Sequence, residues 1–350
     1  MTKEPIRWAV LGCGVIANEM AAALCAHGRR MYGVANRTHE KAVAFAEKYG
    51  VEKVYDSIDG LFSDPAAEAV YITTPHNTHY GFIKKALENG KHVLAEKSIT
   101  LNSGELDELA KLAEGKGLML GEAMTIWHMP LYQKLREIVE SGEYGKVQMI
   151  TLNFGSFKEY DMSNRFFDPA QAGGALLDIG VYALSIVRGF MTSAPDQIRS
   201  QWKPAPTGVD EMATILLKNE EGQMAAVALS LHSKQPKRAM ISLEKGYLEI
   251  MEYPRAARAV FTDAVTGAQT VIEGGDPSAP LRSAQDDSPL CSAQDDGPIQ
   301  DGNALWYELL DMEEAIRTGD PGPLRLRESM DVMAIMTALR REWGLKYPEE

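Results

Sequence analysis

A glycine-rich turn directly after a short apolar segment is the feature that most constrains the fold of this 350-residue chain. The apolar segment Trp8–Leu11 is followed by the spacing GxGxxA and then by an amphipathic stretch. In this arrangement the first glycine permits a tight turn, the second leaves room for a pyrophosphate, and the small third residue lets the helix pack closely on the strand. The residues predicted to contact a dinucleotide here are Gly12, Gly14, Val15, Ile16 and Ala17.

Short apolar runs alternate with longer amphipathic ones through the first third of the chain. The apolar runs lie at residues 6–11, 31–35, 69–73, 92–95 and 118–122, and helical patterns separate them at residues 16–25, 39–49, 79–89 and 103–116. Such alternation is typical of βαβ units in a parallel sheet. We therefore predict an α/β fold whose residues 1–124 form a dinucleotide-binding Rossmann domain, a doubly wound parallel sheet.

The pattern changes after a helical stretch at residues 130–141. Strand-like runs follow at residues 147–154, 211–217, 224–231, 238–243 and 247–251, with helical patterns at residues 173–190, 304–317 and 328–343. Strands that follow one another without intervening helices indicate an antiparallel sheet. We predict that residues 125–350 form a second, α+β domain with an open, mostly antiparallel sheet.

A polar stretch at residues 274–301 contains Ser-Ala-Gln-Asp-Asp twice, at residues 283–287 and 292–296. We interpret it as a surface loop with a small duplication. Its four aspartates could bind a cation, but adjacent acids in a loop are usually solvated.

The second predicted strand ends in a sequence that favours one dinucleotide over the other. An NAD-binding domain usually has Asp or Glu about 20 residues after the glycine turn, where it binds the ribose. This chain has Asn36-Arg37-Thr38 instead. A guanidinium can pair with a 2′-phosphate and a hydroxyl can donate to it, so we predict that Asn36, Arg37 and Thr38 favour NADP(H), with NAD(H) possible. The alternative is that Arg37 is only an exposed residue ahead of a helix.

Charge and cysteine content limit the partners and the location of the chain. The 36 basic and 49 acidic residues give a net charge of −13, which repels nucleic acids and anionic membranes. The three cysteines fit a reducing compartment, no apolar run approaches the roughly 20 residues of a membrane span, and the first residues do not resemble a signal peptide. We expect a cytoplasmic protein. No His, Cys, Asp and Glu set has metal-ligand spacing, so we predict no metal.

Two further motifs carry groups suited to alcohol oxidation. The first is Ala95-Glu96-Lys97, and the second runs from Gly173 to Tyr182 and includes Asp178. Oxidation of a secondary alcohol needs one proton carrier beside the nicotinamide. Tyrosine is a poor base at its usual pKa of about 10, but a nearby ammonium favours the phenolate. Asp178 and Tyr182 are four residues apart on a predicted helix and so share a face.

Together with Thr73-Thr74-Pro75-His76-Asn77-Thr78-His79 and the glycine turn, these motifs resemble the Gfo/Idh/MocA family over nearly the whole chain. Ser98 stands where the family usually has proline after Glu-Lys, and Tyr182 where many members have histidine. The tyrosine form is similar to the NADP-dependent branch that contains dimeric trans-dihydrodiol dehydrogenase and D-xylose dehydrogenase. The resemblance implies a substrate pocket between two domains and a second sheet often used for dimerisation, so we expect a homodimer or higher homo-oligomer.

The resemblance also implies roles for individual residues. Lys97 and Tyr182 would be the catalytic pair, with Asp178 beside them in orientation and substrate binding. The residues expected at the nicotinamide half of the cofactor are Thr74, Pro75, Asn77, His79, Glu96 and Lys97. The residues expected to contact substrate are Arg165, Trp127, Phe167 and Asp178. The two aromatic residues among them come from a separate argument: aromatic faces suit the C–H surface of a sugar or diol ring, and a pocket of this kind could be built from Trp127, Phe157, Tyr160, Phe166 and Phe167.

The activity expected from these features is NADP(H)-dependent hydride transfer to or from a sugar, polyol or cyclic diol. Two alternatives remain within the fold. One is a glycosidase that retains NAD and shows no net cofactor turnover. The other is a non-catalytic sensor that binds a dinucleotide and a partner protein, although a sensor has no need of a proton carrier.

Overall fold

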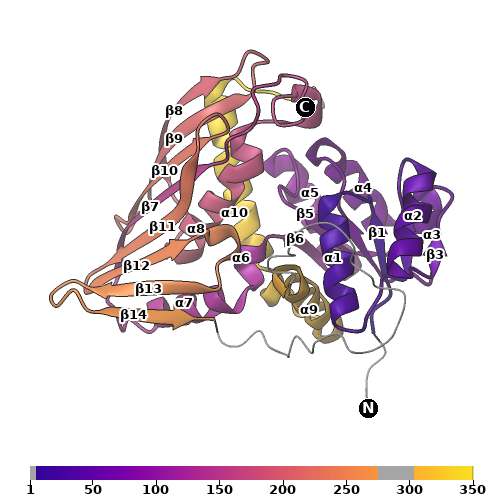
Figure 1. Cartoon of the computed structure of the whole chain (residues 1–350), viewed down its shortest axis with the longest axis horizontal. Helices are drawn as coiled ribbons and strands as arrows, with labels where there is room; N and C mark the ends of the chain where they lie inside the picture. Colours follow the sequence, from indigo (N-terminus) through magenta and orange to yellow (C-terminus); the bar gives the residue numbers. More distant parts are fainter. Residues whose placement is uncertain (1–4, 275–302, 349) are drawn as a thin grey trace. The chain divides into compact units, whose positions relative to one another are not determined.

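The computed structural model describes residues 5–274, 303–348 and 350, and these residues form two compact units (Figure 1). The first unit contains the described residues of Met1–Ile99, Asp107–Ala123 and Pro277–Leu326, and the second those of Thr100–Leu106, Met124–Asp276 and Arg327–Glu350. The predicted duplication at residues 283–287 and 292–296 lies outside the described residues. The predicted α/β fold class, a parallel sheet with a second, mostly antiparallel sheet, is confirmed.

The described part of the first unit is built on a six-stranded parallel sheet in the order β3-β2-β1-β4-β5-β6. Its strands are β1 (Trp8–Leu11), β2 (Gly33–Ala35), β3 (Lys53–Val54), β4 (Ala69–Ile72), β5 (His92–Glu96) and β6 (Leu120–Ala123). Every residue of β1, β2, β4 and β6 is buried, as expected for a parallel sheet whose faces are both covered.

Helices pack on this sheet and supply the rest of the core. They are α1 (Val15–Ala26), α2 (His39–Tyr49), α3 (Ile58–Ser63), α4 (His76–Glu88), α5 (Ser103–Lys116) and α9 (Asn303–Thr318). Local sequence explains several of their ends: Ser57 accepts from Gly60 N at 3.0 Å and caps α3, and α2 stops at Gly50 in the left-handed conformation.

Helix α9 is far along the chain but belongs to the first unit. Its Leu305, Leu309 and Met312 lie in the same core cluster as Trp8. Glu313 of α9 is 1% exposed; it accepts from Trp8 Nε1 at 3.1 Å and from Arg317 Nη2 at 2.6 Å, and it pairs with Arg29. A single boundary at residue 124 therefore does not describe α9, which the sequence analysis placed in the second domain.

The second unit contains, within the described residues, an eight-stranded sheet in the order β14-β13-β12-β11-β7-β10-β9-β8. All neighbours are antiparallel except β7 and β10. The strands are β7 (Val147–Gly155), β8 (Gln197–Pro204), β9 (Asp210–Lys218), β10 (Met224–Ser230), β11 (Gln235–Leu243), β12 (Gly246–Met251), β13 (Arg258–Asp263) and β14 (Gln269–Glu273).

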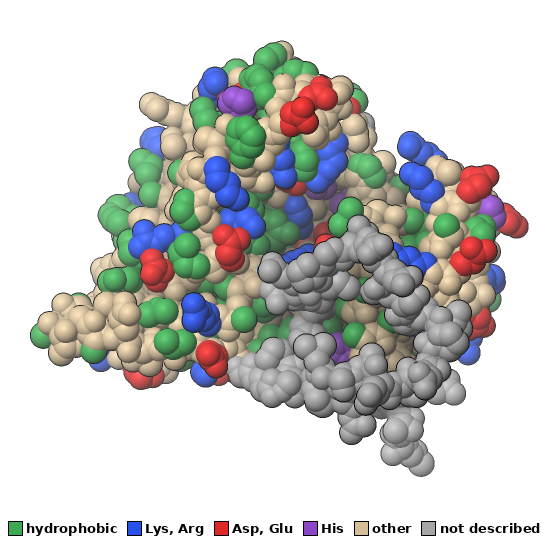
Figure 2. All heavy atoms as spheres, in the orientation of Figure 1, with side chains coloured by type: hydrophobic (Ala, Val, Ile, Leu, Met, Phe, Trp, Pro, Cys, Tyr) green, Lys and Arg blue, Asp and Glu red, His purple; other side chains and the backbone are tan. Residues whose placement is uncertain are grey.

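One face of this sheet is covered and the other is open. The helices of the unit are α6 (Thr125–His128), α7 (Pro130–Glu140), α8 (Val181–Phe190) and α10 (Leu326–Trp343), and α8 packs on β7, β10 and β11. Residues alternate along the strands between buried and exposed positions, as the period of a half-covered sheet requires. Along the margin formed by this sheet, at the left of Figure 2, hydrophobic side chains are interspersed with charged ones.

The helical stretch predicted at residues 173–190 differs from an ordinary α-helix. It begins with a π-helical segment, Leu176–Gly180, and continues as α8. The sequence analysis expected no apolar run to approach the length of a membrane span. The helical stretch Pro169–Phe190 is nevertheless long and apolar enough, by length and composition, to cross a membrane. Its 18-residue window is 78% buried inside the protein, which is the environment of a core helix.

Candidate functional site

The predicted cofactor residues of the first unit follow four neighbouring parallel strands. In the order β2-β1-β4-β5, the segments after the strands are Asn36-Arg37-Thr38, the glycine turn, Thr74-Pro75 and Lys97. Because the carboxyl ends of parallel strands lie along one edge of a sheet, these four segments lie side by side there. After β1 the chain continues to β2 on one side, and after the neighbouring strand β4 it continues to β5 on the other side. The glycine turn, which follows β1, therefore lies at the topological switch point of the sheet, the usual dinucleotide site.

The glycine turn fits a pyrophosphate. Gly12 has φ +107°, and a Cβ at this position would lie 2.5 Å from Thr73 Oγ1. A Cβ at Gly14 would meet no atom of the described residues within 4 Å, so these residues leave room for a ligand above it. Val15 is 79% exposed and α1 has no side-chain cap, whereas Ala17 is fully buried against the core. The first-turn amides of α1 therefore face a site that suits an anion.

The segment after β2 is exposed. Arg37 and Thr38 are both exposed, and Asn36 Nδ2 donates to Thr38 O at 2.9 Å, which holds the turn. No carboxylate stands at this position in the sequence, so nothing in the segment would repel a 2′-phosphate.

The loop that carries Lys97 is held by its neighbours through several hydrogen bonds. Tyr71 OH, from β4, donates to Glu96 Oε1, and Lys97 N donates to Glu96 Oε2 at 3.3 Å. His76 Nε2, in the first turn of α4, lies 3.0 Å from Lys97 O. The Lys97–Ser98 peptide bond is cis, with serine and not proline after it. Lys97 itself is half-buried.

His79 lies beneath this loop and not on its surface. It is 0% exposed, with Nδ1 3.0 Å from Ser98 O and Nε2 2.6 Å from Thr74 O. Burial lowers the pKa of His79, against the opposing effect of its hydrogen bonds to Thr74 and Ser98. The ring thus lies between a carbonyl oxygen of the lysine loop and one of the segment after β4, and in its neutral form, with a single N–H, it donates to one of the two. The burial of His79 does not support the prediction that it contacts the cofactor. Asn77, in the same turn, is half-buried.

Two different close contacts explain why both positions at the start of the second motif are glycine. A Cβ at Gly173 would lie 2.7 Å from the carbonyl oxygens of Arg165 and Phe166. Gly174 has φ +125°, and a Cβ there would lie 2.1 Å from Asp210 Oδ1. The motif thus brings the chain close to two backbone carbonyls and one buried carboxylate at the start of the helix.

Asp178 and Tyr182 belong to the second unit, and Lys97 to the first. Asp178 lies in the π-helical segment and Tyr182 in the first turn of α8. Arg165 Nη2 lies 3.8 Å from Asp178 Oδ1, and these side chains are 56% and 13% exposed. The structure therefore brings two of the predicted substrate residues together. A π-helical turn frequently marks a functional site.

The other two predicted substrate residues are not accessible. Trp127 is 1% exposed, donates to Ser329 Oγ at 3.2 Å and packs against Gly189 of α8. Phe167 is 0% exposed and lies edge-on to the Tyr160 ring. Both side chains fill the core, so their burial gives no support to the prediction that they contact substrate.

Exposed aromatic rings surround the Arg165 segment instead. Phe157 and Tyr160 are 60% and 43% exposed, and both rings lie against His232. Arg165 Cζ and Lys158 Nζ each lie 4.0 Å from the centre of the Phe166 ring. Aromatic and cationic groups of this kind suit the flat face of a ring and its oxygen substituents.

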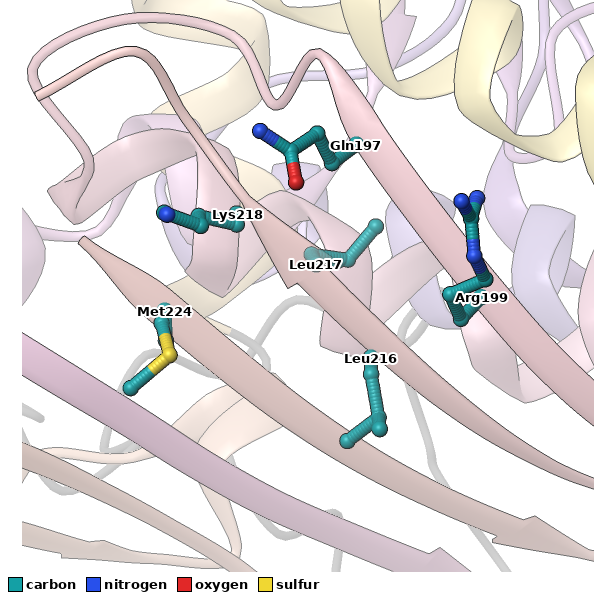
Figure 3. A pocket seen from close by; sticks show the side chains of 6 residues that line it. All are labelled: Gln197, Arg199, Leu216, Leu217, Lys218 and Met224. Carbon is teal, nitrogen blue, oxygen red and sulfur yellow. The ribbon is translucent and has the colours of Figure 1, made fainter. Parts of the chain in front are cut away.

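A shallow pocket on the second sheet is of a different kind. It is lined by Gln197, Arg199, Leu216, Leu217, Lys218 and Met224, on β8, β9 and β10 (Figure 3). None of these residues is a proton carrier of the type the two motifs supply, so we assign it no catalytic role.

Sequence reasoning missed two residues that support the predicted site. Tyr71 positions Glu96, and Asp210 contacts the start of the motif helix. Asp210 left a recognisable signal, because an Asp-Glu pair begins an otherwise apolar strand, whereas Tyr71 looks like an ordinary core residue in the sequence. His76, which contacts the Lys97 carbonyl, was singled out from its place after the proline turn as a structural or cofactor-loop residue.

Comparison with known proteins defines the class. Residues 6–124 match an oxidoreductase family described by its NAD-binding Rossmann fold, and residues 132–249 match the GFO/IDH/MocA C-terminal domain. The protein is therefore an oxidoreductase with an NAD-binding Rossmann domain. It belongs to the Gfo/Idh/MocA family.

Relatives cover the whole chain at modest identity. Trans-1,2-dihydrobenzene-1,2-diol dehydrogenases of Mus musculus and Homo sapiens are each 28% identical, over 353 and 351 residues, with 99% of this chain and 99% of the relative covered. A 3-ketoreductase from Actinomadura kijaniata, crystallised with NADP and TDP-benzene, has a TM-score of 0.77 at 21% identity, covering 97% of this chain and 98% of that one. A putative myo-inositol dehydrogenase from Sinorhizobium meliloti 1021 has a TM-score of 0.74 at 20% identity, with the same coverage.

Proposed function

We propose that the protein catalyses NADP(H)-dependent hydride transfer between the nicotinamide and a secondary alcohol or carbonyl of a sugar, polyol or cyclic diol. The order of segments along the edge of the parallel sheet carries this proposal. Arg37 follows β2, the glycine turn follows β1, Thr74-Pro75 follows β4 and Lys97 follows β5. This order matches a dinucleotide laid from its adenosine ribose to its nicotinamide, with Lys97 at the reactive end.

The chemistry assigned to the protein is proton transfer. When bound, the nicotinamide supplies or accepts the hydride. Tyr182 takes the hydroxyl proton in oxidation and returns it to the carbonyl oxygen in reduction, and the Lys97 ammonium favours the phenolate form of Tyr182. Asp178, with Arg165 3.8 Å away, binds and orients substrate hydroxyl groups.

The preference for NADP(H) rests on Arg37 and Thr38. Both are exposed beside the turn that Asn36 holds, and the segment Asn36-Arg37-Thr38 itself contains no acid. The crystallised ketoreductase relative of the same fold was solved with NADP. Arg37→Ala should therefore raise KM for NADP(H) far more than KM for NAD(H), because only the former carries the phosphate. Lys48→Ala, an exposed cation in the last turn of α2, is the matched control, and equal effects of Arg37→Ala on both cofactors would remove the assignment.

The substrate class is tested with a panel of pentoses, hexoses, polyols, trans-dihydrodiols and dicarbonyls, each with NADP(H) and followed at the nicotinamide absorbance. The named relatives are dehydrogenases of a cyclic diol, and the exposed rings beside Arg165 suit such a face. We expect turnover with at least one member. A panel without cofactor turnover contradicts the proposal and favours the glycosidase or sensor alternatives.

We also propose that the open face of the second sheet forms a homo-oligomer contact. Strand register places Leu216, Met224, Met149, Met251 and Val271 on the same face, and they are 59%, 44%, 39%, 48% and 53% exposed. Exposed apolar side chains that recur on one face of a sheet are typical of a protein–protein contact. Leu216→Glu should shift light-scattering mass towards the monomer. Val265→Glu, at a 94% exposed turn position, should not, and an unchanged mass for Leu216→Glu contradicts the proposal.

A further inference from the structure

Asp210 is a buried carboxylate that the proposed chemistry does not use. It begins β9 and is 0% exposed, and its Oδ2 accepts a hydrogen bond from Leu176 N at 2.6 Å. Leu176 is the first residue of the π-helical segment, and Ala175, which precedes it, makes no side-chain cap. A residue on a strand therefore performs the function of an N-cap for a helix elsewhere in the chain.

The packing around Asp210 is arranged for this contact. Asp210 Oδ1 has no hydrogen-bond partner among the described residues, and a Cβ at Gly174 would occupy a position 2.1 Å from it. Only glycine leaves the carboxyl group enough room at this distance. The second glycine of the motif and the buried aspartate thus form one arrangement, contributed by two distant parts of the sequence.

A second contact holds the same turn from the C-terminal region. Tyr347 OH donates to Gly173 O at 2.6 Å, and Arg340 Cζ lies 4.8 Å from the centre of the Tyr347 ring. Arg340 is 2% exposed and pairs with Glu350 through Nη1 at 2.6 Å and Nη2 at 2.9 Å. The chain before the π-helical segment is therefore fixed at its carbonyl by Tyr347, while the amide of Leu176 is fixed by Asp210.

Burial raises the pKa of Asp210 to about 7, and the capped amides and Arg340 lower it in opposition. The protonated and the ionised carboxyl group both keep an oxygen that accepts from Leu176 N. The hydrogen bond that caps the turn can therefore form in both protonation states, although the buried charge makes the ionised state the less stable one.

We infer that Asp210 is a positioning residue, whose acceptor oxygen orients the first turn of the helical stretch that carries Asp178 and Tyr182. The inference rests on the proposed function, because it takes Tyr182 as the proton carrier. Asp178 and Tyr182 follow Leu176 by two and six residues, so a change in the first turn alters the direction of both side chains. A displacement of about 1 Å at a reacting group can cost about 100-fold in rate.

Two variants of nearly the same shape separate the acceptor from the charge. Asp210→Asn keeps an acceptor oxygen, and Asp210→Leu removes it. Asp263→Leu is the matched control, since Asp263 also accepts backbone hydrogen bonds, from Val265 N at 3.0 Å and Thr266 N at 2.8 Å, at the end of β13. If Asp210→Leu does not fold, Asp210→Ala takes its place.

The first measurement is hydrogen exchange of residues 174–184 in the full-length protein without ligand. We expect Asp210→Leu to raise exchange at least tenfold, corresponding to a loss of about 1.4 kcal/mol in local stability, with Asp210→Asn and Asp263→Leu within twofold of wild type. Unchanged exchange in Asp210→Leu, or equal increases in Asp210→Leu and Asp210→Asn, would overturn the inference.

The second measurement is turnover with a substrate found in the panel. We expect Asp210→Leu to lower kcat about 10- to 100-fold at unchanged KM for NADP(H), and Asp210→Asn to restore it. A kcat within twofold of wild type in Asp210→Leu overturns the inference. If the wild-type protein turns over no substrate, the proposed function fails, and hydrogen exchange alone decides whether Asp210 holds the turn.

Discussion

The two proposed catalytic groups are supported in opposite ways. Lys97 follows a strand, and the carbonyl oxygens of Lys97 and Ser98 are contacted by two histidines of α4. Tyr182 lies on a helix whose first amide is held by a carboxylate from a strand. Burial lowers the pKa of His79 and raises that of Asp210, so both groups favour their neutral forms. Each catalytic group is thus held through the main chain by a buried polar side chain that the chemistry itself does not require.

The largest effects should come from the catalytic groups. Tyr182→Phe should lower kcat about 10²- to 10⁴-fold because it removes the proton carrier, with the Kd for NADP(H) within about twofold of wild type. Lys97→Met should lower kcat comparably but also weaken NADP(H) binding, since Lys97 follows β5 at the edge of the sheet where we propose that the cofactor binds. Steady-state kinetics and cofactor fluorescence titration measure both. Near wild-type turnover in Tyr182→Phe would falsify the proton-carrier role.

Substituting one tightly packed glycine in each unit tests the packing of the two motifs. Gly174→Ala should destabilise the second unit by about 3 kcal/mol, because its Cβ meets a buried carboxylate at a positive φ. Gly12→Ala should cost less, about 1–2 kcal/mol, because the Thr73 hydroxyl it meets can rotate.

Urea unfolding measures both glycine variants. Gly208→Ala is the control for Gly174→Ala, because Gly208 has φ +93° with nothing within 4 Å of its Cβ position. Equal losses in Gly174→Ala and Gly208→Ala would mean that backbone conformation alone, and not the carboxylate, requires glycine at 174.

His79→Asn tests whether the lysine loop is held as firmly as the helix. Loss of one or both buried contacts should cost about 2 kcal/mol in stability and lower kcat about tenfold. His92→Asn is the comparison, since His92 Nδ1 accepts from Met119 N at 2.9 Å away from the loop. It should lose stability without losing kcat in the folded enzyme. An equal loss of kcat in both variants would show that His79 acts through general stability only.

The smallest effects should appear as opposite responses to pH, at most about 1.4 kcal/mol per pH unit. The lowered pKa of His79 gives stability above pH 6.5 that is lost as pH falls towards its folded pKa. The raised pKa of Asp210 gives stability below pH 3.8 that is lost as pH rises through about 7.

Hydrogen exchange between pH 5 and pH 8, corrected for intrinsic rates, should show these two responses. Towards acid, residues 73–80 should weaken and residues 174–178 should strengthen. Asp210→Asn should remove the second response. If hydrogen exchange in both segments changes in the same direction with pH, the predicted opposite responses of His79 and Asp210 are wrong.

Much of the fold was predictable because its signals are local. The apolar run Trp8–Leu11 and the glycine spacing after it define a strand, a turn and a helix within one stretch of sequence. The strands β3, β8, β13 and β14 were not predicted. The edge strands β8 and β14 contain few apolar residues, β3 has only two residues, and β13 is a short apolar run between charged residues. Helix α9 was recognised as a helix but not as part of the first unit, because its partner Trp8 is about 300 residues away.

The candidate site was predictable to the extent that motif residues stay exposed. Arg165 and Asp178 were expected to contact substrate, and the structure places them 3.8 Å apart. Trp127 and Phe167 were chosen as aromatic residues near a motif, and composition could not tell that both point into the core. Their exposed neighbours Phe157 and Tyr160 have the same residue types, so only the three-dimensional arrangement separates the two pairs.

Because α9 packs in the first unit, the chain cannot be cut at residue 124 to give an intact cofactor-binding unit. A fragment that stops at residue 124 would leave the indole of Trp8 and the guanidinium of Arg29 without their shared acceptor, Glu313. It would also expose the apolar face that Leu305, Leu309 and Met312 cover. A cofactor-binding module taken from this protein must therefore carry residues 303–318, joined by a linker or supplied as a separate peptide.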